Sequence, residues 1–179
     1  MRNISGLLLA CAMMACAGTL KAASLKVGDP APDFHATQFD GRKVSLADYR
    51  GQVLLINIWA TWCAPCRKEL PTLDAYVQAA GKWGLRMLAV TTEDSAPMSL
   101  LKKVQGVMTI PMARRFNGKK YDLVKNAVPT NFVIDRAGVV RYAAAGALDL
   151  DALNRILIPL LNEPAPANAA GASVTSAIR

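Results

Sequence analysis

The strongest constraint on the fold is an almost uninterrupted apolar run at residues 52–59, Gln-Val-Leu-Leu-Ile-Asn-Ile-Trp. A strand with apolar side chains on both faces has to be covered on both, which is typical of the central strands of a parallel sheet. A second run of this kind occupies residues 85–92. Between the two, residues 63–80 carry apolar side chains at helical spacing and are followed by Gly81 and Gly84, which end the pattern. This strand–helix–strand order predicts an α/β domain with a parallel core.

The remaining segments predict a mixed sheet around this core. Asp40-Gly41 separates two segments of strand character and indicates an N-terminal β-hairpin. Arg136-Ala137-Gly138 indicates the turn of a second antiparallel pair. We expect further strands at 33–39, 42–46, 107–112, 130–135 and 139–144, a helical turn at 45–50, and helices at 95–104, 118–126 and 148–161. The predicted fold class is therefore α/β, a mixed sheet with helices on both faces.

The first 23 residues have the pattern of a secretory signal peptide. A positive start is followed at residues 4–20 by an uncharged stretch rich in leucine, alanine and methionine. Small residues suited to cleavage lie at 15–17, Ala-Cys-Ala, and near Ala23. The alternatives are a lipid attachment at Cys11 or Cys16 and an uncleaved membrane anchor. All of these predict a domain outside the cytoplasm, in the periplasm or the cell envelope.

Composition divides the rest of the chain into two parts. Hydrophobic residues make up 53% of the chain and charged residues 19%, which is enough apolar material for a buried core and excludes a wholly disordered chain. Residues 163–179 are dominated by alanine, proline, serine and asparagine. We therefore expect a signal peptide or anchor at 1–23, one domain at 24–162 and a flexible tail at 163–179.

The net charge of +8 does not indicate a nucleic-acid partner. Lysine and arginine number 21 against 13 acidic residues, but they are scattered in pairs, and aromatic residues are only 6% of the chain. Nucleic-acid interfaces concentrate basic residues on one face, often with aromatic side chains among them. A positively charged surface without nucleic acid is the expectation.

Only two of the four cysteines belong to the predicted domain. Cys11 and Cys16 lie in the leader, which leaves Cys63 and Cys66. Two cysteines cannot form a zinc site of four thiolates, and the loop that they close is too short to constrain the unfolded chain much. We therefore expect this pair to carry chemistry, with no metal and no other cofactor.

The sequence Trp62-Cys63-Ala64-Pro65-Cys66 lies where the first buried strand passes into a helix. The start of a helix has free N–H groups and a positive dipole end, which stabilise a thiolate and lower the pKa of a cysteine placed there. Cys63 is then the exposed nucleophile, and Cys66, one turn further on and more buried, resolves the mixed disulfide. Pro65 suits the first helical turn. The basic residues that follow, at positions 67 and 68, either add to the positive field or are solvated.

At these residues the chain resembles the thioredoxin superfamily, and more closely the TlpA/ResA-like thiol-disulfide oxidoreductases. The resemblance is carried by residues 57–71, by Gly-Asp-Pro-Ala-Pro-Asp-Phe at 28–34 and by Val-Pro-Thr at 128–130, and it extends over residues 25–161. It implies a thioredoxin-like sheet and an extracytoplasmic protein disulfide reductase. It also implies that residues 95–112 form the central αβ insertion of this branch.

The resemblance assigns roles to individual residues. Cys63 matches the attacking cysteine and Cys66 the resolving one. Pro129 matches a cis-proline that faces the dithiol, so that the backbone of Val128 pairs with an extended substrate. Glu69 matches an acid that accepts the proton of Cys66, although a glutamate at this position could also be a surface residue.

Further positions complete the expected site. Trp62, Ala64 and Pro65 are expected to contact the substrate beside the cysteines. Asn57 stands where cytoplasmic thioredoxins have a buried aspartate, a replacement usual in the TlpA-like branch, and removes that proton acceptor.

The resemblance also implies partners. These are disulfide-bonded or thiol-containing proteins and a membrane thiol donor, with apocytochrome c as one substrate class. Residues 125–130 lack the glycines and the glutamate of the cytochrome-maturation subgroup, which does not favour a role restricted to that pathway. The sequence Ala-Arg-Arg at 113–115 replaces an acidic residue that is usual after the short strand.

Two other functions compete with this interpretation. A peroxidase of the peroxiredoxin type needs a threonine three positions before its reactive cysteine, where this chain has Ala60. A copper-handling dithiol protein of related fold has a wider cysteine spacing and a later histidine, whereas the single histidine here is His35. Neither pattern is present.

Overall fold

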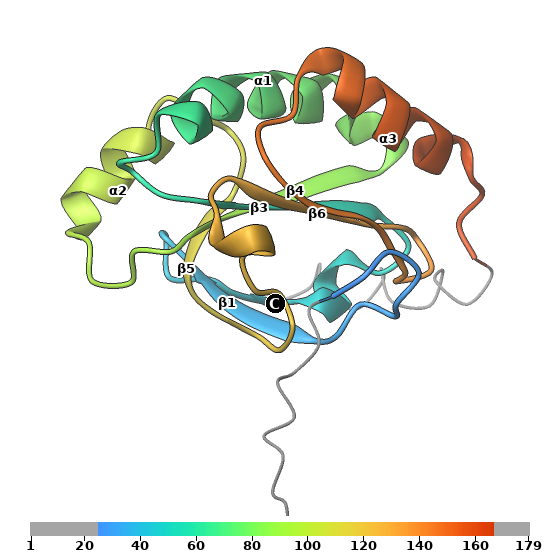
Figure 1. Cartoon of the computed structure of the whole chain (residues 1–179), viewed down its shortest axis with the longest axis horizontal. Helices are drawn as coiled ribbons and strands as arrows, with labels where there is room; N and C mark the ends of the chain where they lie inside the picture. Colours follow the sequence, from blue (N-terminus) through green and yellow to red (C-terminus); the bar gives the residue numbers. More distant parts are fainter. Residues whose placement is uncertain (1–24, 167–179) are drawn as a thin grey trace, which may run out of the picture.

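A seven-stranded mixed sheet forms the centre of the molecule in a computed structural model that describes residues 25–166 (Figure 1). The sheet order is β2-β1-β5-β4-β3-β6-β7. The strands are β1 Phe34–Gln38, β2 Lys43–Ser45, β3 Val53–Trp59, β4 Leu85–Thr91, β5 Met112–Gly118, β6 Thr130–Ile134 and β7 Val140–Ala145. The helices are α1 Ala64–Ala80, α2 Met98–Gln105 and α3 Leu150–Asn162, with 3₁₀ helices η1 Leu46–Tyr49, η2 Gly81–Trp83 and η3 Val124–Asn126. The predicted leader and residues 167–179 of the predicted tail lie outside the described part.

The central strand β3 explains the long apolar run. It pairs in parallel with β4 and antiparallel with β6, and all seven of its residues are buried. Alternate side chains enter two separate cores: Leu55 packs on the side of Leu70 and Leu157, and Ile56 on the opposite side with Phe132. A strand covered on both faces has to be apolar at nearly every position, and Asn57 is the exception in β3.

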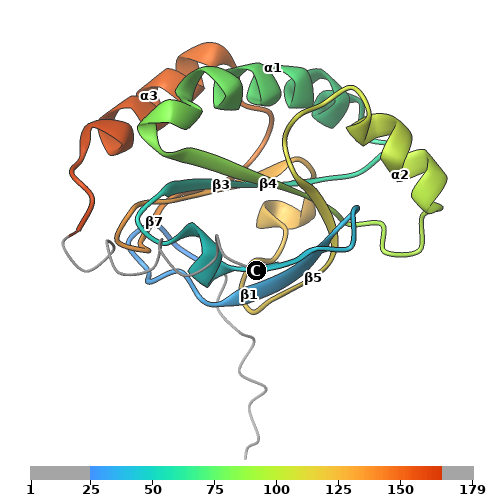
Figure 2. The ribbon, with the colours of Figure 1, turned by 180° about the vertical axis from the view of Figure 1, so that it is seen from behind.

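The two faces of the sheet are covered differently. The three α-helices lie on one face (Figures 1 and 2), where α1 and α3 contribute Leu73 and Leu153 to the core. The other face is covered by the β1–β2 hairpin and by residues near η1 and η3, such as Leu46 and Val124. Helical segments therefore lie on both faces, as predicted, but the second face carries only single 3₁₀ turns.

The helix predicted at 118–126 is wrong. Gly118 ends β5, and the 3₁₀ helix η3 is the only helical segment between Gly118 and β6. The side chain of Tyr121 fixes this segment, because its hydroxyl donates to the Pro32 carbonyl at 2.9 Å and its ring packs edge-on against Phe34 and Phe132. Lys125 has a φ of 54°, which is incompatible with a continuous α-helix.

The strand predicted at 107–112 is also misplaced, because β5 starts at Met112 and runs to Gly118. Most of it pairs antiparallel with β1, and the register shifts between His35 and Thr37. Arg115 has a φ of 55° at this irregularity and acts as the extra residue of a β-bulge. The adjacent arginines interrupt the apolar pattern of this strand, so the pattern alone does not identify it.

The hairpin and the insertion are confirmed. β1 and β2 are antiparallel, with His35 opposite Ser45, and Gly41 has the positive φ of 93° that its turn requires. α2 and β5 lie between β4 and β6 in the chain, as expected for a central αβ insertion. α2 begins at Met98, three residues later than the helix predicted at 95–104, and ends at Gln105, one residue later than predicted.

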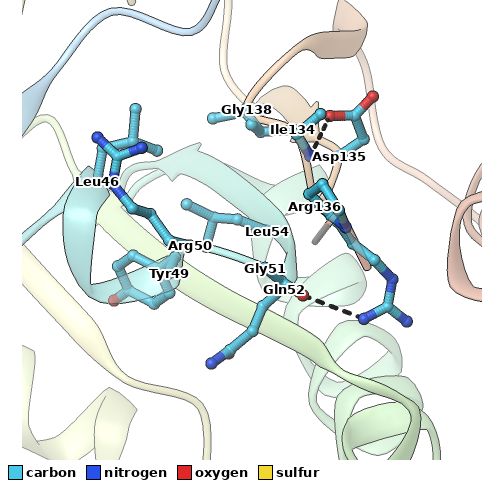
Figure 3. A pocket seen from close by; sticks show the side chains of 12 residues that line it. Leu46, Tyr49, Arg50, Gly51, Gln52, Leu54, Ile134, Asp135, Arg136 and Gly138 are labelled. Carbon is cyan, nitrogen blue, oxygen red and sulfur yellow. Dashed lines mark hydrogen bonds between the residues drawn. The ribbon is translucent and has the colours of Figure 1, made fainter. Parts of the chain in front are cut away.

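The end of the sheet opposite the cysteines is held by Arg136. Its guanidinium donates to the carbonyls of Gly51, Trp83 and Leu161 at 3.1, 2.8 and 3.1 Å, which ties the start of β3 to the ends of η2 and α3. A cavity of about 190 Å³ lies beside it (Figure 3). The neighbouring Tyr49 is largely enclosed, and this burial raises its pKa to about 12.

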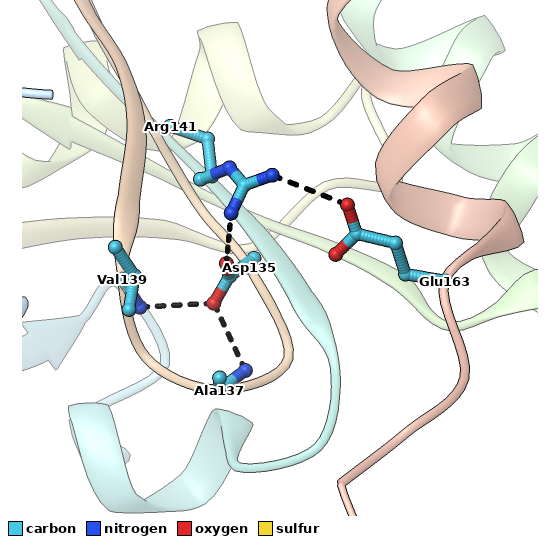
Figure 4. Close-up of polar contacts among 5 residues, drawn as sticks. All are labelled: Asp135, Ala137, Val139, Arg141 and Glu163. Atoms are coloured by element: carbon cyan, nitrogen blue, oxygen red, sulfur yellow. Dashed lines mark hydrogen bonds and ion pairs between the residues drawn. The ribbon is translucent and has the colours of Figure 1, made fainter. Parts of the chain in front are cut away.

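The β6–β7 turn has its own polar anchor at Asp135 (Figure 4). Its Oδ1 accepts the backbone N–H groups of Ala137 and Val139, both at 2.9 Å, and its Oδ2 pairs with Arg141 at 3.2 Å. Arg141 also pairs with Glu163, just after α3. Because both side chains of that second pair are well exposed, it contributes at most about 1 kcal/mol to stability.

Within residues 25–166, no helix is long and apolar enough to cross a membrane. The same part of the chain contains no group of three or more His, Cys, Asp or Glu side chains placed to hold a metal ion.

Candidate active site

The two cysteines form a disulfide at the start of α1. Cys63 is the N-cap of the helix and Cys66 lies in its first turn, with 5.3 Å between their Cα atoms. The Cys66 N–H donates to the Cys63 Sγ at 3.1 Å, so the helix terminus places a donor directly on the predicted nucleophile. Cys63 is 3% exposed and Cys66 0%, so both sulfur-bearing residues are buried in the disulfide form. The predicted exposure of Cys63 is therefore wrong, although Cys63 is slightly more accessible than Cys66, as predicted.

The Val128–Pro129 segment lies against this dithiol. The Val128–Pro129 peptide bond is cis, as predicted, and the Val128 carbonyl oxygen is 3.6 Å from the Cys63 Sγ. Val128 is partly buried and Pro129 is buried, whereas Ala64 and Pro65 on α1 are exposed. The structure thus brings these predicted contact residues together around one sulfur atom.

Trp62 stands out from this surface. Its side chain is 68% exposed although it directly precedes a nearly buried cysteine. By contrast, Trp59 at the end of β3 is fully buried. The two tryptophans of the motif therefore lie in different environments, Trp59 in the core and Trp62 on the surface next to Cys63 in the chain.

The loop before Cys63 is held by two charged side chains that the sequence did not indicate. The Glu93 carboxylate accepts both the N–H and the hydroxyl of Thr61, the latter at 2.9 Å. Arg67 donates to the Thr61 carbonyl at 2.9 Å. Every polar group of Thr61 is thus bonded, and Arg67, although exposed, has a specific partner.

Glu69, one turn after Cys66 on α1, is buried, with 3% of its surface exposed, and is not the surface glutamate that was the alternative prediction. Its Oε1 accepts from Asn131 Nδ2 at 2.9 Å and from the Leu148 N–H at 2.7 Å, and its Oε2 accepts from Asn57 Nδ2 at 3.1 Å. Cys66 precedes it by three positions on α1, so both side chains lie on one side of the helix.

Burial raises the pKa of Glu69 above its ordinary value. The hydrogen bonds from Leu148, Asn131 and Asn57 favour the charged form and oppose this effect, but they do not cancel it. A carboxyl group with a raised pKa is a better proton acceptor near neutral pH than an ordinary glutamate.

Asn131 and Leu148 are members of the site that sequence reasoning missed. Asn131 is the β6 partner of Asn57 across the sheet, and Asn57 Nδ2 donates to its Oδ1 at 2.8 Å. The available signal was a polar residue directly after the Val-Pro-Thr motif, followed in the same strand by the apolar Phe132. The Leu148 contribution is a backbone N–H, which no residue pattern shows.

Comparisons with known proteins agree with this geometry. A family model described as the AhpC/TSA family matches residues 27–143. The "Thiol-disulfide oxidoreductase ResA" of Geobacillus kaustophilus is 32% identical over 140 residues, covering 75% of this chain and 78% of the relative. The protein of the same name from Oceanobacillus iheyensis is 34% identical over 138 residues, covering 74% and 71%.

Solved structures support the same fold. A thiol:disulfide interchange protein of the thioredoxin family from Chlorobium tepidum superposes with a TM-score of 0.63, at 23% identity over 78% of this chain and 99% of that one. The chain therefore belongs to the AhpC/TSA family and has a thioredoxin-like fold. Within that class it is a thiol-disulfide oxidoreductase of the TlpA/ResA-like branch.

Proposed function

We propose that the protein is an extracytoplasmic reductase of protein disulfides. The observation that carries this proposal is the placement of the Cys63–Cys66 pair at the start of α1, one helical turn before the buried Glu69. A carboxylate near the resolving cysteine favours release of electrons to a substrate, because it accepts the proton that the thiol has to lose.

The reaction runs through one mixed disulfide. The Cys63 thiolate attacks a substrate disulfide, a bond forms between Cys63 and one substrate sulfur, and the other substrate sulfur leaves with the electron pair and takes up a proton. Cys66 then gives its proton to Glu69, and its thiolate attacks the Cys63 sulfur. The Cys63–Cys66 bond forms, the bond to the substrate breaks, and the second substrate thiolate is released. The protein is oxidised by two electrons and the substrate reduced by two.

The surface around Cys63 suits an extended polypeptide. Trp62, Ala64 and Pro65 are exposed and largely apolar on one side of the sulfur. On the other side, the Val128 N–H has no backbone acceptor in the part of the chain from 25 to 166. A substrate strand could pair with it while its cysteine meets Cys63, and Pro129 holds the segment in place.

Location and electron source are parts of the same proposal. The signal-like residues 1–23 support export to the periplasm or cell envelope, with a membrane thiol donor re-reducing the dithiol. The names of the two ResA relatives refer to thiol-disulfide chemistry and name no substrate. Cytochrome c thiols are one substrate class, which residues 125–130 do not favour. The intact mass of the protein in the envelope fraction tests the cleavage near Ala23.

A synthetic peptide with an internal disulfide tests the function. When the reduced protein is mixed with an excess of the oxidised peptide, we expect the peptide to gain the mass of two hydrogen atoms while the protein loses the same mass, in equal amounts. Mass spectrometry after acid quenching measures both. Oxidation of the reduced peptide by the disulfide form of the protein, with no transfer in the predicted direction, would contradict a reductase.

A further inference from the structure

The buried environment of Glu69 is asymmetric. Its Oε1 accepts two hydrogen bonds, from Asn131 Nδ2 and the Leu148 N–H, which together use the two in-plane lone pairs of that oxygen. Among residues 25–166, its Oε2 accepts only one hydrogen bond, from Asn57 Nδ2, and at 3.1 Å this is the longest of the three. A proton that arrives at this carboxyl group therefore finds a free lone pair on Oε2 and none on Oε1.

Asn131 is the residue that creates this asymmetry. Its amide nitrogen donates to Glu69 Oε1 at 2.9 Å and to the Gly146 carbonyl at 3.1 Å, and its Oδ1 accepts from Asn57 at 2.8 Å. Both amide hydrogens are used, and the side chain is fully buried. It therefore has a single orientation that satisfies its neighbours.

The same amide connects the carboxyl group to the substrate-facing segment. The Gly146 N–H donates to the Pro129 carbonyl at 2.9 Å, and the Gly146 carbonyl accepts from Asn131. Leu148, two residues further along this loop, donates to Glu69. One short loop thus contacts both the proton acceptor and the cis-proline, with Asn131 between them.

We propose that Asn131 is a positioning residue for dithiol exchange: it saturates Oε1 of Glu69, directs the proton of Cys66 to Oε2, and fixes the carboxyl group relative to the Val128–Pro129 segment. This proposal rests on the function proposed above, in which Glu69 accepts that proton. In this proposal the neutral amide of Asn131 determines which oxygen of the Glu69 carboxyl group takes up the proton. It also influences the pH at which that carboxyl group ionises.

In the described part of the chain, few other ionisable groups surround Glu69. Cys66 lies on the same helix, and in the disulfide form it does not titrate. From β7, Tyr142 is close enough for the Glu69 charge to raise its pKa, after the larger effect of burial, while Arg155 of α3 lowers it. β3 and β6 contribute only the neutral Asn57 and Asn131. In the oxidised protein, a change in the titration of Glu69 can therefore be assigned to the amide that is altered.

Two substitutions of Asn131 test the proposal. Asn131→Ala removes a donor that favours the charged carboxylate, so the pKa of Glu69 should rise by about half a unit to one unit. Asn131→Asp keeps the shape but places a second carboxyl group against Oε1, and because two adjacent carboxylates resist double ionisation the rise should be about one unit or more. The readout is the ¹³C titration of the Glu69 side-chain carboxyl carbon in the oxidised protein, assigned by its loss in Glu69→Gln.

Controls separate this proposal from the function on which it rests. Asn154→Ala removes an exposed asparagine of α3 that bonds Tyr76, and it should leave the Glu69 titration unchanged. Parent-like titration of Glu69 in both Asn131 variants, whatever their melting temperatures, would show that Asn131 is only structural. A shifted titration, together with a pH profile of peptide reduction that Glu69→Gln leaves unaltered, would retain the positioning of the carboxyl group and overturn its role in proton transfer.

Discussion

Replacing Cys66 by serine should stop turnover and leave the protein joined to its substrate. Cys63 keeps its place at the N-cap of α1 and still attacks a substrate disulfide, but no second thiol can release the product. We expect the rate of product release to fall by about a thousandfold or more. A covalent adduct should appear in its place, and non-reducing gel electrophoresis or intact mass spectrometry measures it.

The matched control for this trap is Cys63→Ser. Because Cys66 is fully buried, it should form no adduct on the same timescale. Cys63→Ser also controls for thiols elsewhere in the full chain, since Cys11 and Cys16 are present in both variants. Equal trapping by the two variants, with the adduct located by peptide mapping at residues 63–66, would show that the order of attack is not the one that their burial indicates.

Replacing Asp74 by alanine should destabilise the fold strongly. Asp74 is a buried residue of α1, and its Oδ1 accepts from the N–H and the hydroxyl of Thr109 and from the N–H of Ile110, all at 2.8 Å. Removal of the carboxyl group leaves two backbone N–H groups without this partner just before β5. The free energy of unfolding should fall by about 3 kcal/mol, as measured by urea denaturation of the oxidised protein.

Two further variants show whether this loss comes from the hydrogen bonds. Asp74→Asn keeps one oxygen acceptor and should lose less than half as much stability. Asp151→Ala removes an exposed aspartate in the first turn of α3 and should cost less than about 0.5 kcal/mol. If Asp74→Ala resembled Asp151→Ala, the anchor between α1 and the segment before β5 would not be structural.

The central strands and the helix that starts at the dithiol could be predicted because the pattern of apolar residues within each segment indicates which side chains are buried. The seven buried positions of β3 leave little alternative to a covered strand, and the Gly41 turn fixes a hairpin locally. The prediction failed between residues 107 and 126, where tertiary contacts decide. Tyr121 packs against Phe34 and Phe132, which are distant in sequence, on the face of the sheet opposite the α-helices. This packing prevents the helix that the local pattern favours.

The residues of the site also fall into two groups, those that sequence motifs predict and those that tertiary contacts place. Cys63, Cys66 and Pro129 could be placed from motifs, because each is tied to a turn or a helix start. Glu93 and Asn131 could not, since their partners are Thr61 and Glu69, 32 and 62 positions away, and form only after the sheet is assembled. The polar residues that hold a reactive group in place are thus less visible in a sequence than the reactive group.

The reduction potential of the Cys63–Cys66 pair tests the central claim most directly. The protein is equilibrated with glutathione or dithiothreitol buffers of graded ratio, and the thiol and disulfide forms are separated after acid quenching. The account predicts a value near that of thioredoxin, about −270 mV, at which the dithiol reduces protein disulfides. A value near about −120 mV would make the protein an oxidant and would contradict the account.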